Sequence, residues 1–220
     1  MATTYSQASE RQGRAGARLA LIEAAPLAWL VSLPSGITSL LPLLPVTNES
    51  GELCAFDGHL ANNNPQLQAM KAGQNALVLF RGPEGYASPS CLSNRSQAPT
   101  WMFVAAKFVV TFELREGRDA IKSHLNELVA QMESRVAGDW CIAEMGERFD
   151  SLATRITAFR ATITQSVDEF KLGQSEELSV LREMIDGLAG QGKTELVQWI
   201  HRENPQAAPR QSGGHVENHS

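Results

Sequence analysis

An amide-rich segment offers the first chemistry in this 220-residue chain. Asn62–Asn64 precede Pro65, Gln66 follows it, and Lys71 comes one turn later. If Pro65 opens a short helix, these amides and the first backbone N–H groups could hold an anion such as a phosphate, because helix N-termini favour negative charge. An Asn-rich turn before a proline is also an ordinary helix cap. The residues alone leave both interpretations open.

Aromatic residues near a long loop could hold a flat ligand. Trp101 could form an apolar wall, and the Thr100 hydroxyl could bond to the edge of the ligand. Tyr86 opens a loop rich in Ser, Pro, Asn and Gln, and long loops within compact domains are often functional. The alternative is that Trp101 is plain core and that the loop is plain surface.

Proton transfer could involve His59 and Glu84. His59 could bond a phosphate, act as a general acid or ligate haem, and a single histidine does not choose among these roles. Glu84 could move a proton, although a surface glutamate is the simpler interpretation. The candidate catalytic residues are therefore Glu84, Tyr86 and His59.

Motifs and composition argue against several functional classes. The chain has no Gly-rich phosphate loop, nucleophile elbow or metal-ligand cluster, so we expect no metal site. Its net charge of −5 opposes attraction to phosphate backbones, so we do not expect direct nucleic-acid binding. Three cysteines without a CxxC pair indicate no disulfide framework. With no signal-like or membrane-length apolar run, we expect a cytoplasmic protein that does not enter the membrane.

Short apolar runs separated by turns predict an antiparallel sheet with helices packed outside it. Strands are expected at Leu27–Leu33, Thr38–Val46, Leu53–Gly58, Ala76–Arg81, Trp101–Leu114 and Leu152–Thr164. Helices are expected at Ala15–Ala25, Gln66–Ala72, Arg118–Val136, Trp140–Phe149, Ser175–Leu188 and Thr194–His201. Residues 1–15 and 204–220 are expected to be disordered tails, which leaves one domain at residues 16–203. The fold class is α+β, mainly antiparallel β.

Four motifs in register resemble one protein family. Gly58–Gln66, Phe80–Ser90, Pro99–Trp101 and Phe170–Gln174 are similar, in order and spacing, to the PaiB family of FMN-binding split barrels. The resemblance implies a six-stranded split β-barrel with peripheral and C-terminal helices, related in fold to the pyridoxamine-phosphate oxidases. It also implies a homodimer with FMN bound at the subunit interface.

The resemblance also implies a cofactor site. The residues expected to contact FMN are Ser39, His59, Asn62, Asn64, Gln66, Thr100, Trp101, Lys171 and Gln174. Of these, Lys171 and Gln174 would reach the flavin from the second subunit. The chain departs from the family pattern with apolar residues at Leu40, Leu92, Met102 and Phe103, which suggests a pocket for a more apolar ligand.

These features favour an FMN-dependent oxidoreductase that acts on a small, fairly apolar metabolite, such as a specialised metabolite. A second hypothesis is an FMN-binding negative transcriptional regulator, the role commonly described for the family. A third is a repurposed split barrel that has lost FMN and binds only a ligand or a partner. The expected partners are a small molecule and a second copy of the chain.

Overall fold

The computed structural model describes residues 16–208 and divides into two compact units. The barrel unit comprises Met1–Gly82 and Ala105–Glu169, and the helical unit comprises Pro83–Val104 and Phe170–Ser220. The expected tails at residues 1–15 and 209–220 lie outside the described residues. Within residues 204–208, Asn204 and Ala207 are buried.

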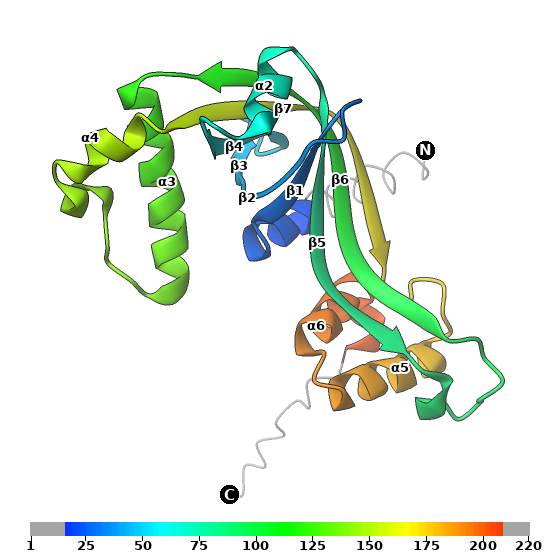
Figure 1. Cartoon of the computed structure of the whole chain (residues 1–220). Coiled ribbons are helices and arrows are strands. Elements are labelled where there is room, and N and C mark those ends of the chain that lie inside the picture. Colours follow the sequence, from blue (N-terminus) through cyan, green and yellow to red (C-terminus); the bar gives the residue numbers. More distant parts are fainter. Residues whose placement is uncertain (1–15, 209–220) are drawn as a thin grey trace, which may run out of the picture. The chain divides into compact units, whose positions relative to one another are not determined.

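Seven strands form one sheet in the order β2-β1-β5-β6-β7-β4-β3 (Figure 1). They are β1 (Leu27–Ser32), β2 (Thr38–Pro42), β3 (Leu44–Thr47), β4 (Leu53–Ala61), β5 (Ala76–Ala87), β6 (Thr100–Arg115) and β7 (Ile156–Lys171). The pairs β1–β2, β1–β5, β3–β4 and β4–β7 are antiparallel. The predicted α+β split barrel is confirmed, with seven strands instead of six.

The additional strand arises because the predicted strand Thr38–Val46 is two strands. Only Leu43 separates β2 from β3, yet these strands stand at opposite ends of the sheet order. The Leu43 N–H donates to the Pro26 carbonyl oxygen at 2.9 Å, and Pro42 has no N–H to extend a ladder. Therefore β2 pairs with β1 while β3 pairs with β4, and the sheet curls into a barrel.

Strand β5 runs beyond its predicted end. The sequence predicts an end at Arg81, before Gly82 and Pro83, but β5 continues to Ala87. Its register with β1 covers only Ala76–Leu79. Because Pro83 lies past that register, its missing N–H removes no hydrogen bond to β1.

The core of the barrel unit is aromatic at its centre. Phe56, Phe80 and Phe108 are almost fully buried, and their ring centroids lie 5.0 to 5.9 Å apart. On β1, Ala28 and Leu30 point inward and are fully buried, as the twofold alternation of a strand requires. This packing fixes which face of each strand is available to ligands.

The barrel unit also contains helices. They are residues 16–24, α2 (Pro65–Lys71), α3 (Arg118–Val136) and α4 (Arg148–Ala153), with a 3₁₀ turn, η2, at Ile142–Met145. The prediction of α3 is confirmed to the residue, whereas Trp140–Phe149 contains η2 and the start of α4 instead of one helix. Because α4 continues to Ala153, β7 begins at Ile156, later than the predicted Leu152. Helices α3 and α4 share an apolar core of Ile121, Ile142, Phe149, Ala153 and Ala158.

The helical unit contains α5 (Leu178–Gly190) and α6 (Thr194–Glu203), which lie side by side (Figure 1, orange). Both helices are predicted from the sequence, although α5 begins three residues later than the predicted Ser175. A Cβ at Gly85 would lie 2.9 Å from side-chain carbons of both Leu188 and Leu196. Because Gly85 has no Cβ, β5 can pack closely against both helices at this position.

Candidate functional site

Three predicted cofactor residues, Ser39, Asn64 and Gln66, form one hydrogen-bonded cluster at the start of α2. The Asn64 side-chain oxygen accepts a hydrogen bond from the Gln66 backbone N–H at 2.8 Å and so caps the helix. Its Nδ2 donates to Ser39 Oγ at 3.1 Å. The Gln66 side chain accepts from Ser39 at 3.1 Å and donates to Ser32 at 2.8 Å. Gln66 is fully buried, so its amide positions Ser39 and is not open to a ligand.

The N–H groups in the first turn of α2 are already used. Pro65 has no N–H, the Gln66 N–H bonds to the Asn64 side chain, and the Leu67 N–H bonds to the Asn64 carbonyl at 3.0 Å. The exposed Asn63 side chain has no hydrogen bond within residues 16–208. An anion at the start of α2 would therefore contact side-chain amides and not the backbone N–H groups of the helix.

The β1–β2 hairpin presents apolar side chains to solvent on its outer face. Leu27, Trp29 and Leu40 are 54%, 48% and 47% exposed. Trp29 and Leu40 are directly opposite each other in the register of the hairpin. A contiguous exposed apolar surface of this kind is typical of a site that binds a ligand or another protein.

His59 contacts a histidine of α3 instead of the amide cluster. Its Nδ1 lies 2.9 Å from Nε2 of His124, which is buried and whose Nδ1 has no partner within the described chain. Burial, and next the neighbouring His59, lower the pKa of His124 to about 4. Burial also lowers the pKa of His59. Both rings are therefore neutral at pH 7, which does not suit a phosphate ligand.

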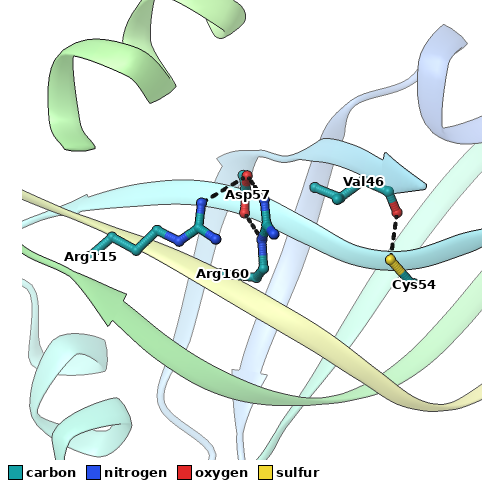
Figure 2. A network of polar contacts seen from close by, with 5 residues as sticks. All are labelled: Val46, Cys54, Asp57, Arg115 and Arg160. Carbon is teal, nitrogen blue, oxygen red and sulfur yellow. Dashed lines mark hydrogen bonds and ion pairs between the residues drawn. The ribbon is translucent and has the colours of Figure 1, made fainter. Parts of the chain in front are cut away.

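Asp57 is a buried carboxylate that sequence reasoning missed (Figure 2). It accepts hydrogen bonds from Arg160 at 2.8 and 2.7 Å and a longer one from Arg115 at 3.4 Å. Asp57 and Arg160 are directly opposite in the β4–β7 register, and the hydrogen bonds to Asp57 raise the pKa of Arg160. The only sequence signal was an aspartate within the apolar strand Leu53–Ala61. The network links three strands on the face that also carries His59.

A cavity of about 720 Å³ lies in the barrel unit among α2, the start of α3, α4 and the start of β7. Among the predicted cofactor residues of this unit, Asn62 lines the cavity. Its Nδ2 donates to the Thr154 carbonyl at 2.9 Å, and its Oδ1 accepts from the Thr157 hydroxyl at 2.7 Å. Lys71 also lines the cavity, so it lies on the α2 face that meets this space.

The helical unit holds the predicted residues Tyr86, Trp101 and Glu84. The ring centroids of Tyr86 and Trp101 lie 5.8 Å apart, and the two side chains are 42% and 50% exposed. Glu84 lies 3.9 Å from the ammonium group of Lys193. Trp101 is thus an exposed ring paired with Tyr86, not the plain core residue of the alternative interpretation.

The remaining predicted residues of the helical unit are Thr100, Lys171 and Gln174. The Gln174 side chain donates to the Phe170 carbonyl at 2.7 Å and accepts from the Leu172 N–H at 3.0 Å, so it closes the turn after β7. Lys171 is exposed and Thr100 is half-buried. Ser39, Asn64 and Gln66 thus form a cluster within the barrel unit, and Tyr86 and Trp101 form a pair within the helical unit.

The arrangement of the metal-ligating and thiol side chains can be stated for the described part of the chain. Within residues 16–208, no group of three or more His, Cys, Asp or Glu side chains is arranged to hold a metal ion. Cys54, Cys91 and Cys141 are free thiols. In the same residues, no helix combines the length and apolar character needed to cross a membrane.

A family comparison decides the assignment. Residues 4–165, well over half of the chain, match the family described as "Putative FMN-binding domain". The chain belongs to this family. FMN is accordingly its cofactor, and the PaiB-like resemblance of the sequence motifs is confirmed.

One curated relative and two solved structures illustrate the similarity. A 58-residue stretch is 38% identical to the "Protease synthase and sporulation protein PAI 2" of Bacillus subtilis (strain 168), and it covers 26% of this chain and 28% of that protein. The FAD and heme binding protein from Mycobacterium smegmatis is similar with a TM-score of 0.50 at 17% identity, over 69% of this chain and 68% of that one. A conserved hypothetical protein from Mycobacterium tuberculosis is similar with a TM-score of 0.51 at 9% identity. The similarity covers 74% of this chain and 88% of that one. These two structures share the fold.

The residues of the barrel unit fit the chemistry of FMN. A flavin mononucleotide needs hydrogen-bond donors for its phosphate and an apolar surface for its ring system. Asn63 and the second N–H of the Asn64 amide supply donors, and the exposed Trp29 and Leu40 supply apolar surface.

Proposed function

We propose that FMN binds at the corner of Ser39, Asn63 and Asn64, with its ring system against Trp29 and Leu40. The bonds of Ser39 and Asn64 to the buried Gln66 hold their side chains in one orientation before a ligand arrives. The observation that carries the proposal is this pre-bonded amide cluster on a hairpin whose outer face is exposed and apolar.

The proposal includes a homodimer. Leu27, Trp29 and Leu40 form an apolar surface that a second copy of the chain would cover, and FMN would then be enclosed between subunits. Lys171 and Gln174 of the second copy remain the proposed additional contacts to the flavin. The three free thiols fit the reducing cytoplasm, which we keep as the proposed location.

We further propose that the protein is an oxidoreductase for a small, apolar metabolite. Bound FMN supplies the hydride or electron transfer, while the side chains of the chain bind the substrate and exclude water. Leu40 stands where the PaiB pattern carries a histidine, so this surface favours apolar substrates. Glu84, Tyr86 and His59 remain the proposed proton-transfer residues, with Thr100 and Trp101 as proposed flavin contacts.

The test of this activity uses the purified chain reconstituted with FMN. Under anaerobic conditions NADH or NADPH should bleach the flavin, and menadione, an apolar quinone, should reoxidise it faster than ferricyanide does. Leu40→Gln should reduce the preference for menadione, whereas Leu152→Gln, an exposed leucine of α4, should not. A flavin that neither nicotinamide reduces would contradict this activity.

A second candidate function is regulation of gene expression. It is favoured by the similarity to the sporulation protein PAI 2, which involves only a quarter of each chain. The net charge of −5 makes a protein partner the better candidate than DNA. Deletion of the gene, followed by transcript measurement with and without a variant that cannot bind FMN, tests this role.

A further inference from the structure

The cavity of the barrel unit carries charged groups that the proposed FMN site does not use. Small-molecule pockets typically measure about 300 to 1,000 Å³, and this cavity has about 720 Å³. Ser39, Asn64 and Gln66 are not among its lining residues. The cavity is therefore distinct from the amide cluster.

One side of the cavity is apolar and held rigidly. Leu67 of α2 is 2% exposed, and Ile121 and Ala153 belong to the core that α3 and α4 share. Ile156 packs against the same core. Because packing fixes these side chains, the apolar wall exists before a ligand binds, and burying apolar ligand surface against it stabilises a complex.

The charged side chains of the cavity divide into a bonded pair and two unpaired residues. Arg118 forms an ion pair with Asp150 and also lies over the ring of Phe149, 5.5 Å from its centroid. Lys71 and Glu116 have no ion pair or hydrogen bond within residues 16–208, so they do not neutralise each other. The cavity thus offers one open positive and one open negative group.

We propose that this cavity binds a zwitterionic amphiphile, namely an α-amino acid with a large apolar side chain or a close derivative. The ligand carboxylate pairs with Lys71, its ammonium group pairs with Glu116, and its side chain covers Leu67 and Ile121. A zwitterion satisfies both open charges, whereas a simple acid or amine leaves one of them unmatched. The Arg118–Asp150 pair is neutral as a unit and borders the site without selecting either sign.

Three compounds with one phenyl group test the charge requirement. They are L-phenylalanine, 3-phenylpropionate, which lacks the amine, and 2-phenylethylamine, which lacks the carboxylate. Isothermal titration calorimetry on the purified full chain measures each dissociation constant. We expect L-phenylalanine to bind about tenfold more tightly than either analogue, because each analogue loses one charge-assisted hydrogen bond.

Two charge variants assign the roles of the lining residues. Lys71→Gln should weaken L-phenylalanine and 3-phenylpropionate about tenfold and leave 2-phenylethylamine unchanged. Glu116→Gln should weaken L-phenylalanine and 2-phenylethylamine and leave 3-phenylpropionate unchanged. Arg182→Gln and Glu195→Gln, exposed charges of the helical unit that do not line the cavity, should change none of the three constants.

A third variant tests the place of binding. Ala153→Leu should fill the apolar wall and weaken all three compounds, and a thermal melt monitored by circular dichroism establishes that the variant is folded. Equal affinities for the three compounds, no binding at millimolar concentration, or displacement of L-phenylalanine by saturating FMN would each overturn the proposal. Failure of FMN to bind while L-phenylalanine still binds would contradict only the proposed flavin site.

Discussion

At the scale of single residues, His124 couples the stability of the barrel unit to pH. Its ring is buried, and its pKa in the folded chain is lowered to about 4 from its ordinary value of 6.5. The unfolded chain therefore takes up this proton first, so stability is complete above pH 6.5 and falls as pH decreases from 6.5 towards 4. At about 1.4 kcal/mol per pKa unit, the total loss is about 3 kcal/mol. The lowered pKa of His59 acts in the same direction.

Urea unfolding at about pH 7.5 and about pH 4.5 measures this dependence. His124→Leu removes the titrating ring, so the variant should lose less stability on acidification than the original chain does. A chain whose free energy of unfolding is the same at both pH values would contradict the role of His124.

Some side-chain contacts were predictable from the family resemblance, whereas contacts between distant parts of the sequence were not. The family resemblance placed Ser39, Asn64 and Gln66 among the expected cofactor residues, and the structure brings their side chains into contact. No local pattern could pair His59 with His124, 65 positions later, or Asp57 with Arg160, 103 positions later. These contacts depend on the docking of α3 and on the β4–β7 register, which a single sequence does not encode locally.

At the scale of elements, Gly58 permits β4 to pack against the core. A Cβ at this position would lie 2.7 Å from side-chain carbons of both Leu43 and Phe159, which are fully buried. Gly58→Ala should therefore destabilise the fold by about 1 to 3 kcal/mol through overpacking. Gly190→Ala is the control, because a Cβ there meets nothing within 4 Å. Equal stabilities of the two variants in urea unfolding would contradict this packing role.

Elements were predictable where periodicity is regular and uninterrupted. The apolar spacing of Arg118–Val136 gave α3 its correct ends. Proline was the source of two errors, since Pro42 divides a predicted strand and Pro83 does not end β5. The effect of a proline in a sheet depends on which neighbour needs its N–H, and that neighbour is set by tertiary pairing.

At the scale of the whole molecule, the outer face of the β1–β2 hairpin should join two chains. Trp29→Ser combined with Leu40→Ser removes the centre of this face, and loss of an interface aromatic alone costs about 2 kcal/mol, or about 30-fold in dissociation constant. Size-exclusion chromatography with light scattering should find a dimer that the double variant converts to monomers. Trp140→Ser, an exposed tryptophan outside the hairpin, should remain dimeric. If the chain without substitutions is a monomer, this result would contradict the proposed interface.

The division into two units leaves little trace in the sequence. Strands β5, β6 and β7 each contribute residues to both units, so no linker or break in composition marks the boundary. The family model covers residues 4–165, which include all of the described barrel unit except its last residues. The whole-molecule account therefore depends most on whether that unit holds FMN.

Titration of the purified chain with FMN, followed by equilibrium dialysis, tests this central claim most directly. The account predicts one FMN per chain, with altered visible absorbance of the bound flavin and release of intact FMN on heating. Asn64→Ala should weaken FMN binding about tenfold through loss of a hydrogen bond to a charged group, and Asn94→Ala, in the loop before β6, should not. A folded chain that takes up no FMN would contradict the account.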